Sequence, residues 1–137
     1  MKTEFPRLLH LGVAVRDIDK AVSAYKALLG YRVLSGPVHD ELQHVTVCFV
    51  GTGAPLELSL ELIEPGGTES PINKILARGG GAYHTCYEVD NIDEFLVTAR
   101  SLGCVILARP VPAAAFQGRR IAWLYSPSGQ LMEMLER

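Results

Sequence analysis

Two stretches of this sequence decide the fold: HLGVAVRDID at residues 10–19 and HTCYEVDNID at residues 84–93. When they are aligned at their histidines, a valine and an Ile-Asp pair also coincide. Apolar matches alone would carry little weight, because any two strand-and-helix segments resemble each other. The shared histidine makes the match more specific, and it indicates that the chain contains an internal duplication.

The duplication extends to the end of each half. Leu29-Gly30 matches Leu102-Gly103, and the stretch LELIE at residues 60–64 matches MEMLE at residues 132–136. Each copy therefore carries a histidine near its start and a glutamate near its end. These pairs are His10 with Glu61 and His84 with Glu133.

Both halves predict the same order of elements. The segments 8–15 and 83–89 alternate as half-buried strands do. An amphipathic helix follows each strand, with Asp17 and Asn91 as N-caps and Gly30 and Gly103 as left-handed helix ends. Further strands are expected at 31–35, 43–50 and 56–64 in the first half, and at 104–108, 119–125 and 130–136 in the second.

The predicted fold class is therefore α+β, with two βαβββ modules in tandem within a single domain of residues 1–137. The modules cover about 8–65 and 82–137. Between them, Ser70-Pro71 predicts the start of a short linker helix at about 70–78, which the glycines at 79–81 end.

Strand alternation indicates which side chains share a face. In segment 8–15 the larger apolar residues are expected to face the helices, which leaves the histidine on the other face. The same reasoning turns the two repeated glutamates away from the helices. If the two sheets pair with pseudo-twofold symmetry, two imidazoles and two carboxylates converge. That donor set suits one divalent transition metal and leaves room for waters or a chelating substrate, with His10, Glu61, His84 and Glu133 as the predicted ligands.

Composition and charge argue against several classes of protein. The net charge is -2 and no basic cluster exceeds Arg119-Arg120, which disfavours a nucleic-acid or anionic-membrane partner. No segment has the ~18 apolar residues of a membrane span, and Met1–Glu4 lack the apolar stretch of a signal peptide. Cys48, Cys86 and Cys104 show no metal-type spacing. A cytoplasmic protein with buried, reduced thiols is expected.

The sequence resembles the vicinal oxygen chelate superfamily (glyoxalase/bleomycin resistance/dioxygenase fold), and within it the methylmalonyl-CoA epimerases. The resemblance is carried by HLGVAV from His10, LELIEP from Leu60, YHTCYEVDNID from Tyr83 and GRRIAW from Gly118. It implies a cup-shaped mixed sheet and the same four ligands on one divalent metal, with Zn, Co, Ni, Mn or Fe as candidates. Some of these epimerases have glutamine at the position of Glu61. The His/Glu/His/Glu set of this chain also resembles that of metal-dependent glyoxalase I.

The chemistry that the resemblance implies is removal of an α-proton from an acyl-CoA or 2-oxo substrate, with the metal stabilising the enolate. In the epimerases a glutamate is thought to be the base. The segment 44–48 of this chain offers no carboxylate in register. The candidate bases are therefore His44 and the metal-binding carboxylates Glu61 and Glu133, with Glu41 and Glu57 as further choices.

Two further positions bear on the substrate. Arg119 and Arg120 precede a strand at which the family contacts substrate carboxylate or phosphate groups, so both are candidate substrate-binding residues. Strand alternation lets only one of them face inward. Tyr83 stands where the epimerases usually have another histidine before the ligand, and this departure concerns the substrate more than the metal.

Three other functions stay open. The first is a lactoylglutathione lyase of the glyoxalase I type. The second is an Fe(II) extradiol dioxygenase, although such sites resemble a triad of two histidines and one carboxylate, and Glu61 would be a fourth ligand. The third is a non-enzymatic protein that sequesters a drug or natural product, although such members typically lack the metal ligands. The resemblance also implies a homodimer, because relatives are commonly dimers and an open sheet has apolar rims to cover.

Overall fold

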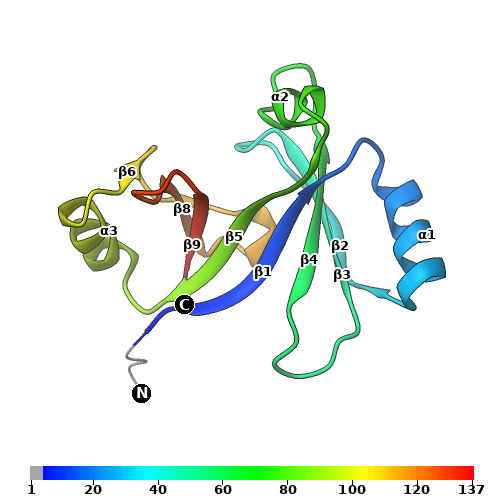
Figure 1. Ribbon diagram of the computed structural model, residues 1–137, viewed down its shortest axis with the longest axis horizontal. Coiled ribbons are helices and arrows are strands. Elements are labelled where there is room, and N and C mark those ends of the chain that lie inside the picture. Colours follow the sequence, from blue (N-terminus) through cyan, green and yellow to red (C-terminus); the bar gives the residue numbers. More distant parts are fainter. Residues whose placement is uncertain (1–4) are drawn as a thin grey trace. The chain divides into compact units, whose positions relative to one another are not determined.

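The computed structural model describes residues 5–137, which divide into two compact units (Figure 1). We call His10–Tyr83 the first unit, and His84–Arg137 together with residues 5–9 the second unit. The prediction that Met1–Glu4 lack a signal peptide lies outside the described residues. Among residues 5–137, no helix is both long enough and apolar enough to cross a membrane.

The first unit is a mixed four-stranded sheet with two helices. Its strands follow the order β2-β3-β4-β1; β4 and β1 run parallel, as Figure 1 shows, and the other pairs are antiparallel. Its elements are β1 (Arg7–Ala14, which enters this unit at His10), α1 (Ile18–Leu29), β2 (Arg32–Asp40), β3 (Val45–Gly51), β4 (Ser59–Pro65) and α2 (Ile72–Ala77).

The second unit repeats this plan. Its strand order is β5-β9-β8-β6, with β7 paired to β8, and β5 and β9 are the parallel pair. Its elements are β5 (Gly81–Val89, which enters this unit at His84), α3 (Ile92–Ser101), β6 (Val105–Ile106), β7 (Val111–Pro112), the 3₁₀ turn η1 (Ala114–Phe116), β8 (Arg120–Tyr125) and β9 (Leu131–Glu136). Two successive βαβββ arrangements with mixed sheets confirm the predicted fold class.

Two strands differ from the sequence prediction. β2 continues past the Gly36-Pro37 pair to Asp40, with register shifts against β3, where a strand ending at residue 35 was expected. In the second unit a single strand was expected at 104–108, but only the two-residue β6 forms there. A second short strand, β7, pairs with a different part of β8. Pro110 and Pro112 have no amide hydrogen to donate, so a continuous ladder cannot form along this edge.

Both long helices begin as predicted. The side chains of Asp17 and Asn91 accept hydrogen bonds from the third residue beyond, Lys20 N and Glu94 N, each at 3.0 Å. Gly30 ends α1 in the left-handed conformation, with φ of 69°. The C-cap of α3 is Leu102, and Gly103 follows it with φ of 93°. The two N-caps place the start of each helix at the same point of its repeat.

A second duplicated contact ties each helix to the last strand of its unit. Glu64 accepts a hydrogen bond from the amide of Ile18 at 2.8 Å, and Glu136 accepts one from the amide of Ile92 at 3.0 Å. These glutamates are the final residues of the matched stretches LELIE and MEMLE. The last glutamate of each repeat therefore stabilises the first turn of a helix, where carboxylates are favoured.

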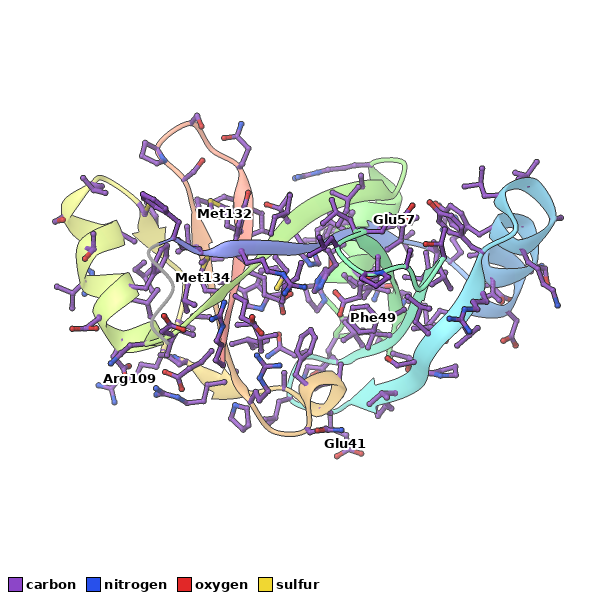
Figure 2. The ribbon with its side chains drawn as sticks, turned by 90° about the horizontal axis from the view of Figure 1, so that it is seen from below. Glu41, Phe49, Glu57, Arg109, Met132 and Met134 are labelled. Atoms are coloured by element: carbon purple, nitrogen blue, oxygen red, sulfur yellow. The ribbon has the colours of Figure 1, made fainter. Side chains whose placement is uncertain are left out.

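Each unit has its own helix-facing core. In the first unit Ile18 of α1 packs with Cys48, Val50 and Leu62. In the second, Ile92 and Leu96 of α3 pack with Leu124 and Met134, and Figure 2 shows Met132 and Met134 along β9. Each fully buried aliphatic side chain of this size contributes about 1.5–3 kcal/mol. A further cluster of the second unit lies on the other face of the sheet and contains Cys86, Ala113, Ile121 and Leu135, with Leu9 packed against it.

The three cysteines are free, as predicted. Cys48 and Cys86 are buried, but Cys104 is only half-buried because it lies in the turn after α3. Burial, followed by the nearby Asp19 carboxylate, raises the pKa of the Cys48 thiol, which makes this thiol unreactive.

Candidate metal centre

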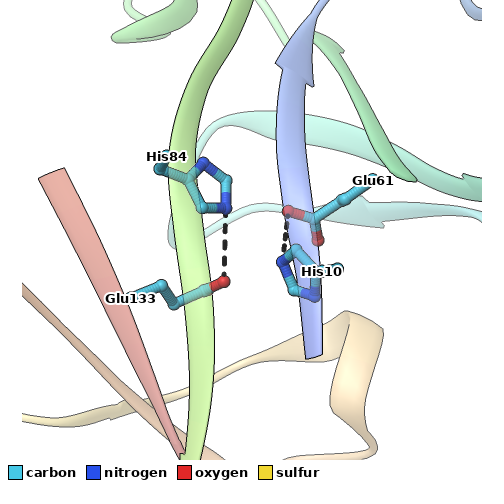
Figure 3. Close-up of side chains that lie close together, drawn as sticks. All are labelled: His10, Glu61, His84 and Glu133. Carbon is cyan, nitrogen blue, oxygen red and sulfur yellow. Dashed lines mark ion pairs between the residues drawn. The ribbon is translucent and has the colours of Figure 1, made fainter. Parts of the chain in front are cut away.

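The first unit brings His10 and Glu61 together. β1 and β4 are parallel neighbours in which Gly12 lies opposite Glu61, and alternation puts both functional side chains on the face turned away from α1. The imidazole Nε2 of His10 lies 3.3 Å from Oε1 of Glu61 (Figure 3). His10 is 2% exposed and Glu61 is 4% exposed, so both polar groups are removed from water.

The second unit forms the same arrangement with His84 and Glu133. β5 and β9 are its parallel neighbours, and Cys86 lies opposite Glu133. The imidazole Nε2 of His84 lies 3.5 Å from Oε1 of Glu133 (Figure 3), and each residue is 3% exposed. The duplication read from the sequence is thus a duplication of geometry, with the same atoms facing each other in both units.

An aromatic ring packs on each histidine. Phe49 of β3 lies opposite Glu61 in the antiparallel ladder, and Trp123 of β8 lies opposite Glu133. The ring of Phe49 meets that of His10 edge to face at 5.2 Å, and Trp123 meets His84 in the same manner at 4.7 Å. We did not predict these contacts, yet Phe49 and Trp123 coincide in the alignment that superposes the two histidines, so the repeat contained the signal.

The donor set fits a divalent cation. A buried carboxylate is costly unless a positive charge or hydrogen-bond donors compensate it, and the set contains two of them. Two neutral imidazoles and two carboxylates are suitable ligands for a transition metal, and the carboxylate charges balance that of the ion. His10, Glu61, His84 and Glu133 are thus all buried and of the right chemical kind to hold one.

The other candidate bases are exposed. His44 lies in the turn between β2 and β3 with a left-handed backbone (φ of 54°), and β3 begins only at the next residue, so strand alternation does not orient its side chain. Glu41 is in the same turn, at the periphery of the view in Figure 2. Glu57 accepts a hydrogen bond from the Thr52 hydroxyl at 2.6 Å in the loop between β3 and β4.

The structure decides which contacts each arginine makes. Arg120 alternates with Ala122 and Leu124, which face α3, and its guanidinium donates to Glu136 and Asp93 at 2.9–3.1 Å. The pKa of Glu136 lies below its ordinary value. The hydrogen bond from Arg120 is the main cause, and the hydrogen bond from the Ile92 amide is the second. Of the two arginines predicted to bind an anion, Arg120 is therefore the one that forms ion pairs with carboxylates at the start of α3.

Arg119 is the residue immediately before β8, and its side chain takes a different course from that of Arg120. Its guanidinium donates to Glu88 at 2.8 Å and to the backbone carbonyl of Glu136 at 2.9 Å. Burial alone would raise the pKa of Glu88, but hydrogen bonds from Arg119 and then Arg137 outweigh it and lower that pKa. Because Glu88 alternates with His84 and Cys86 along β5, its contact with Arg119 lies on the His84 face of the strand.

Comparison with known proteins agrees with this geometry. The sequence model of one protein family, the Glyoxalase/Bleomycin resistance protein/Dioxygenase superfamily, matches residues 9–123 of this chain. The mitochondrial methylmalonyl-CoA epimerase of Bos taurus is 35% identical over 134 residues, which cover 96% of this chain and 74% of the relative. An ethylmalonyl-CoA/methylmalonyl-CoA epimerase of Cereibacter sphaeroides is 32% identical over 133 residues, covering 93% of this chain and 96% of the relative.

A solved structure gives the same result. It holds a methylmalonyl-CoA epimerase in complex with methylmalonyl-CoA and NH4+, and it matches with a TM-score of 0.83 and 27% identity over 97% of this chain and 95% of that chain. The predicted resemblance is confirmed by the family match and by these relatives. With its two βαβββ units and their paired histidines and glutamates, the chain belongs to the glyoxalase/bleomycin resistance protein/dioxygenase superfamily.

Proposed function

We propose that this chain is a divalent-metal-dependent epimerase that inverts the α-carbon of a methylmalonyl-CoA-like thioester. The observation that carries the proposal is the duplicated, buried His–Glu pair, His10 with Glu61 and His84 with Glu133. It is supported by two relatives that are methylmalonyl-CoA epimerases and that match nearly the whole of this chain at 32–35% identity.

In this proposal the two pairs hold one metal ion through Nε2 of each histidine and one carboxylate oxygen of each glutamate. The bound ion supplies positive charge that stabilises the negative charge developing on the substrate as the α-proton leaves. All four residues are buried, so a bound ion would lie in surroundings of low dielectric, where its charge acts more strongly than in water. The identity of the metal, among Zn, Co, Ni, Mn and Fe, is a question for metal analysis.

The base in this proposal is Glu133. Breaking the α-C–H bond transfers the proton to Glu133 and the electron pair to the adjacent carbonyl system. A solvent-derived proton then adds to the opposite face and inverts the centre, and Glu133 releases its proton to solvent. His44, Glu41 and Glu57 are exposed and lie outside the two pairs, so the buried carboxylates are the better candidates. The resemblance to the epimerases implies that glutamine can stand at the position of Glu61. An amide does not accept the proton, so we favour Glu133 over Glu61 as the base.

The substrate class follows from the relatives, whose names and bound ligand specify acyl-CoA thioesters. Arg119 is our candidate for an anionic substrate group because its contact with Glu88 lies on the His84 face of β5. Arg120, which was also predicted to bind substrate, has its contacts at the start of α3. The single-domain organisation and the homodimer stay predictions, and size-exclusion chromatography with light scattering measures the latter.

The experiment combines metal analysis with proton exchange. Purified wild type is analysed for bound metal, and exchange of the α-hydrogen of methylmalonyl-CoA is followed by NMR in deuterated buffer. Glu133→Gln should keep its metal and lose about 10²–10⁴-fold of the exchange rate, the usual contribution of a general base. Glu61→Gln should retain exchange, whereas Glu61→Ala should lose metal.

Glu64→Gln is the matched control. It removes a carboxylate charge from the same strand but from the opposite face, where Glu64 contacts Ile18. Wild-type protein that stays metal-free after metal is supplied would overturn the proposal, as would the absence of exchange with metal bound.

A second candidate function is the glyoxalase I type of lyase, which the His/Glu/His/Glu set favours because the same proton transfer serves a hemithioacetal. Turnover of a hemithioacetal without exchange in methylmalonyl-CoA would select this function. If wild type binds metal but shows neither activity, the remaining candidate functions are a non-enzymatic binding protein and a dioxygenase.

A further inference from the structure

We infer that Phe49 and Trp123 are a matched pair of positioning residues that orient the imidazole rings of His10 and His84 for metal binding. The inference rests on the proposed function, because it assigns a task to residues beside the proposed ligands. Neither aromatic side chain offers a ligand atom to the metal. Each acts through the histidine it contacts.

The first observation is that the contact is made twice with the same geometry. The interplanar angle is 73° for Phe49 on His10 and 85° for Trp123 on His84, with ring centroids 5.2 Å and 4.7 Å apart. Edge-to-face contacts of this kind are favourable because the positive edge of one ring meets the negative face of the other. Each contact restricts rotation of an imidazole about its χ2 torsion, which is otherwise broad.

The second observation is the position of the aromatic residue in the ladder. Phe49 is the cross-strand partner of Glu61, and Trp123 is the cross-strand partner of Glu133. One side chain therefore lies beside both members of its pair, in each unit. With the ring plane held, Nε2 of the histidine points at the glutamate oxygen, as the distances of 3.3 Å and 3.5 Å require.

Core packing alone does not account for this pattern. A core position accepts many apolar residues of similar volume, and the neighbouring core residues differ between the repeats: Val47 aligns with Ile121, and Cys48 with Ala122. At Phe49 and Trp123 both repeats carry an aromatic ring instead. The flat ring is the shared property, and the flat ring is what contacts the histidine.

The two positions differ in one useful respect. Trp123 is the only tryptophan of the chain, so tryptophan fluorescence reports on the surroundings of His84. Binding of Co²⁺ or Ni²⁺ at His84 should quench this emission, because a paramagnetic ion would then lie within a few ångströms of the indole. The quenching titration gives a metal affinity without any assay of enzyme activity.

The test compares Trp123→Leu with Trp123→Phe. Metal affinity of the apoprotein is measured by calorimetry with Co²⁺, and wild type is also titrated by fluorescence. An edge-to-face contact between aromatic rings changes an equilibrium by roughly 2–13-fold, so we expect the metal affinity to fall about 5–10-fold for Trp123→Leu. Trp123→Phe keeps a ring and should stay within about threefold of wild type. Phe49→Leu should weaken binding in the same way through His10, and it serves if Trp123→Leu does not fold.

Two control variants separate orientation from stability. Leu124→Val lies on the same strand but faces α3, so it should lower stability without changing metal affinity. Tyr125→Leu removes an exposed aromatic ring from β8. Equal affinity of Trp123→Leu, Trp123→Phe and wild type would overturn the inference while leaving the proposed metal site intact. Wild type without metal affinity would overturn the proposed function itself.

Discussion

The contact between the last strand and the first helix turn of each unit gives the sharpest test of the duplicated architecture. In the first unit, Glu64 at the end of β4 accepts a hydrogen bond from the amide of Ile18 at 2.8 Å. Ile18 itself is 3% exposed. Glu64→Ala removes the acceptor of this amide. Because Ile18 is buried, water can replace the lost acceptor less easily than at an exposed helix end.

The expected loss follows from the two contributions of the carboxylate. A hydrogen bond to a charged group contributes about 1.5–3 kcal/mol, and this range includes the attraction between the carboxylate and the helix N-terminus. Glu64 is only half-buried, so we expect about 2 kcal/mol for Glu64→Ala. Glu64→Gln keeps a carbonyl acceptor without the charge and should lose about half as much.

Urea unfolding measures the effect. With a slope of about 2 kcal/mol per molar urea, Glu64→Ala should lower the midpoint by about 1 M. Glu69→Ala, an exposed glutamate before α2, is the control and should change stability by less than about 0.5 kcal/mol. Glu136→Ala should be more damaging than Glu64→Ala, because Glu136 accepts from Arg120 as well as from Ile92. A midpoint for Glu64→Ala equal to that of Glu69→Ala would refute the reasoning.

Three further predictions follow from burial and charge. Met134→Ala empties a fully buried position in the core of the second unit and should lower the unfolding free energy by about 2–5 kcal/mol, measured by denaturant titration; a loss below about 1 kcal/mol would contradict the packing described for it. Acid should destabilise the folded protein through Glu136: its folded pKa lies below the ordinary 4.5, so its stabilising effect is complete above that pH and is lost as the pH falls through the lowered value. Unfolding titrations at about pH 6 and about pH 3.5 should show this loss in wild type and a smaller one in Glu136→Gln. Of the three thiols, Cys104 should react with a disulfide reagent in the folded protein, whereas Cys48 and Cys86 should react only on unfolding; rapid reaction of all three without denaturant would show that the cores open readily.

Most of the fold could be read from local pattern. The helix starts at Asp17 and Asn91 were predictable because a capping side chain needs only its own sequence neighbours. The edge strands were less predictable. β2 passes through Gly36-Pro37, and β6 and β7 share an edge interrupted by proline, because pairing with a neighbouring strand decides whether such segments extend.

For the candidate site, the sequence by itself determined the four ligand types and their repeat, since strand alternation is a property of the chain and puts His10 and Glu61 on one face whatever their surroundings. Only the tertiary structure decided that parallel pairing of β1 with β4, and of β5 with β9, brings each histidine within 3.5 Å of its glutamate. It also decided that Phe49 and Trp123 pack on the histidines, and that Arg119 and Arg120 contact different carboxylates. These last facts depend on which strand lies beside which, and strand pairing is determined by long-range packing that no local pattern contains.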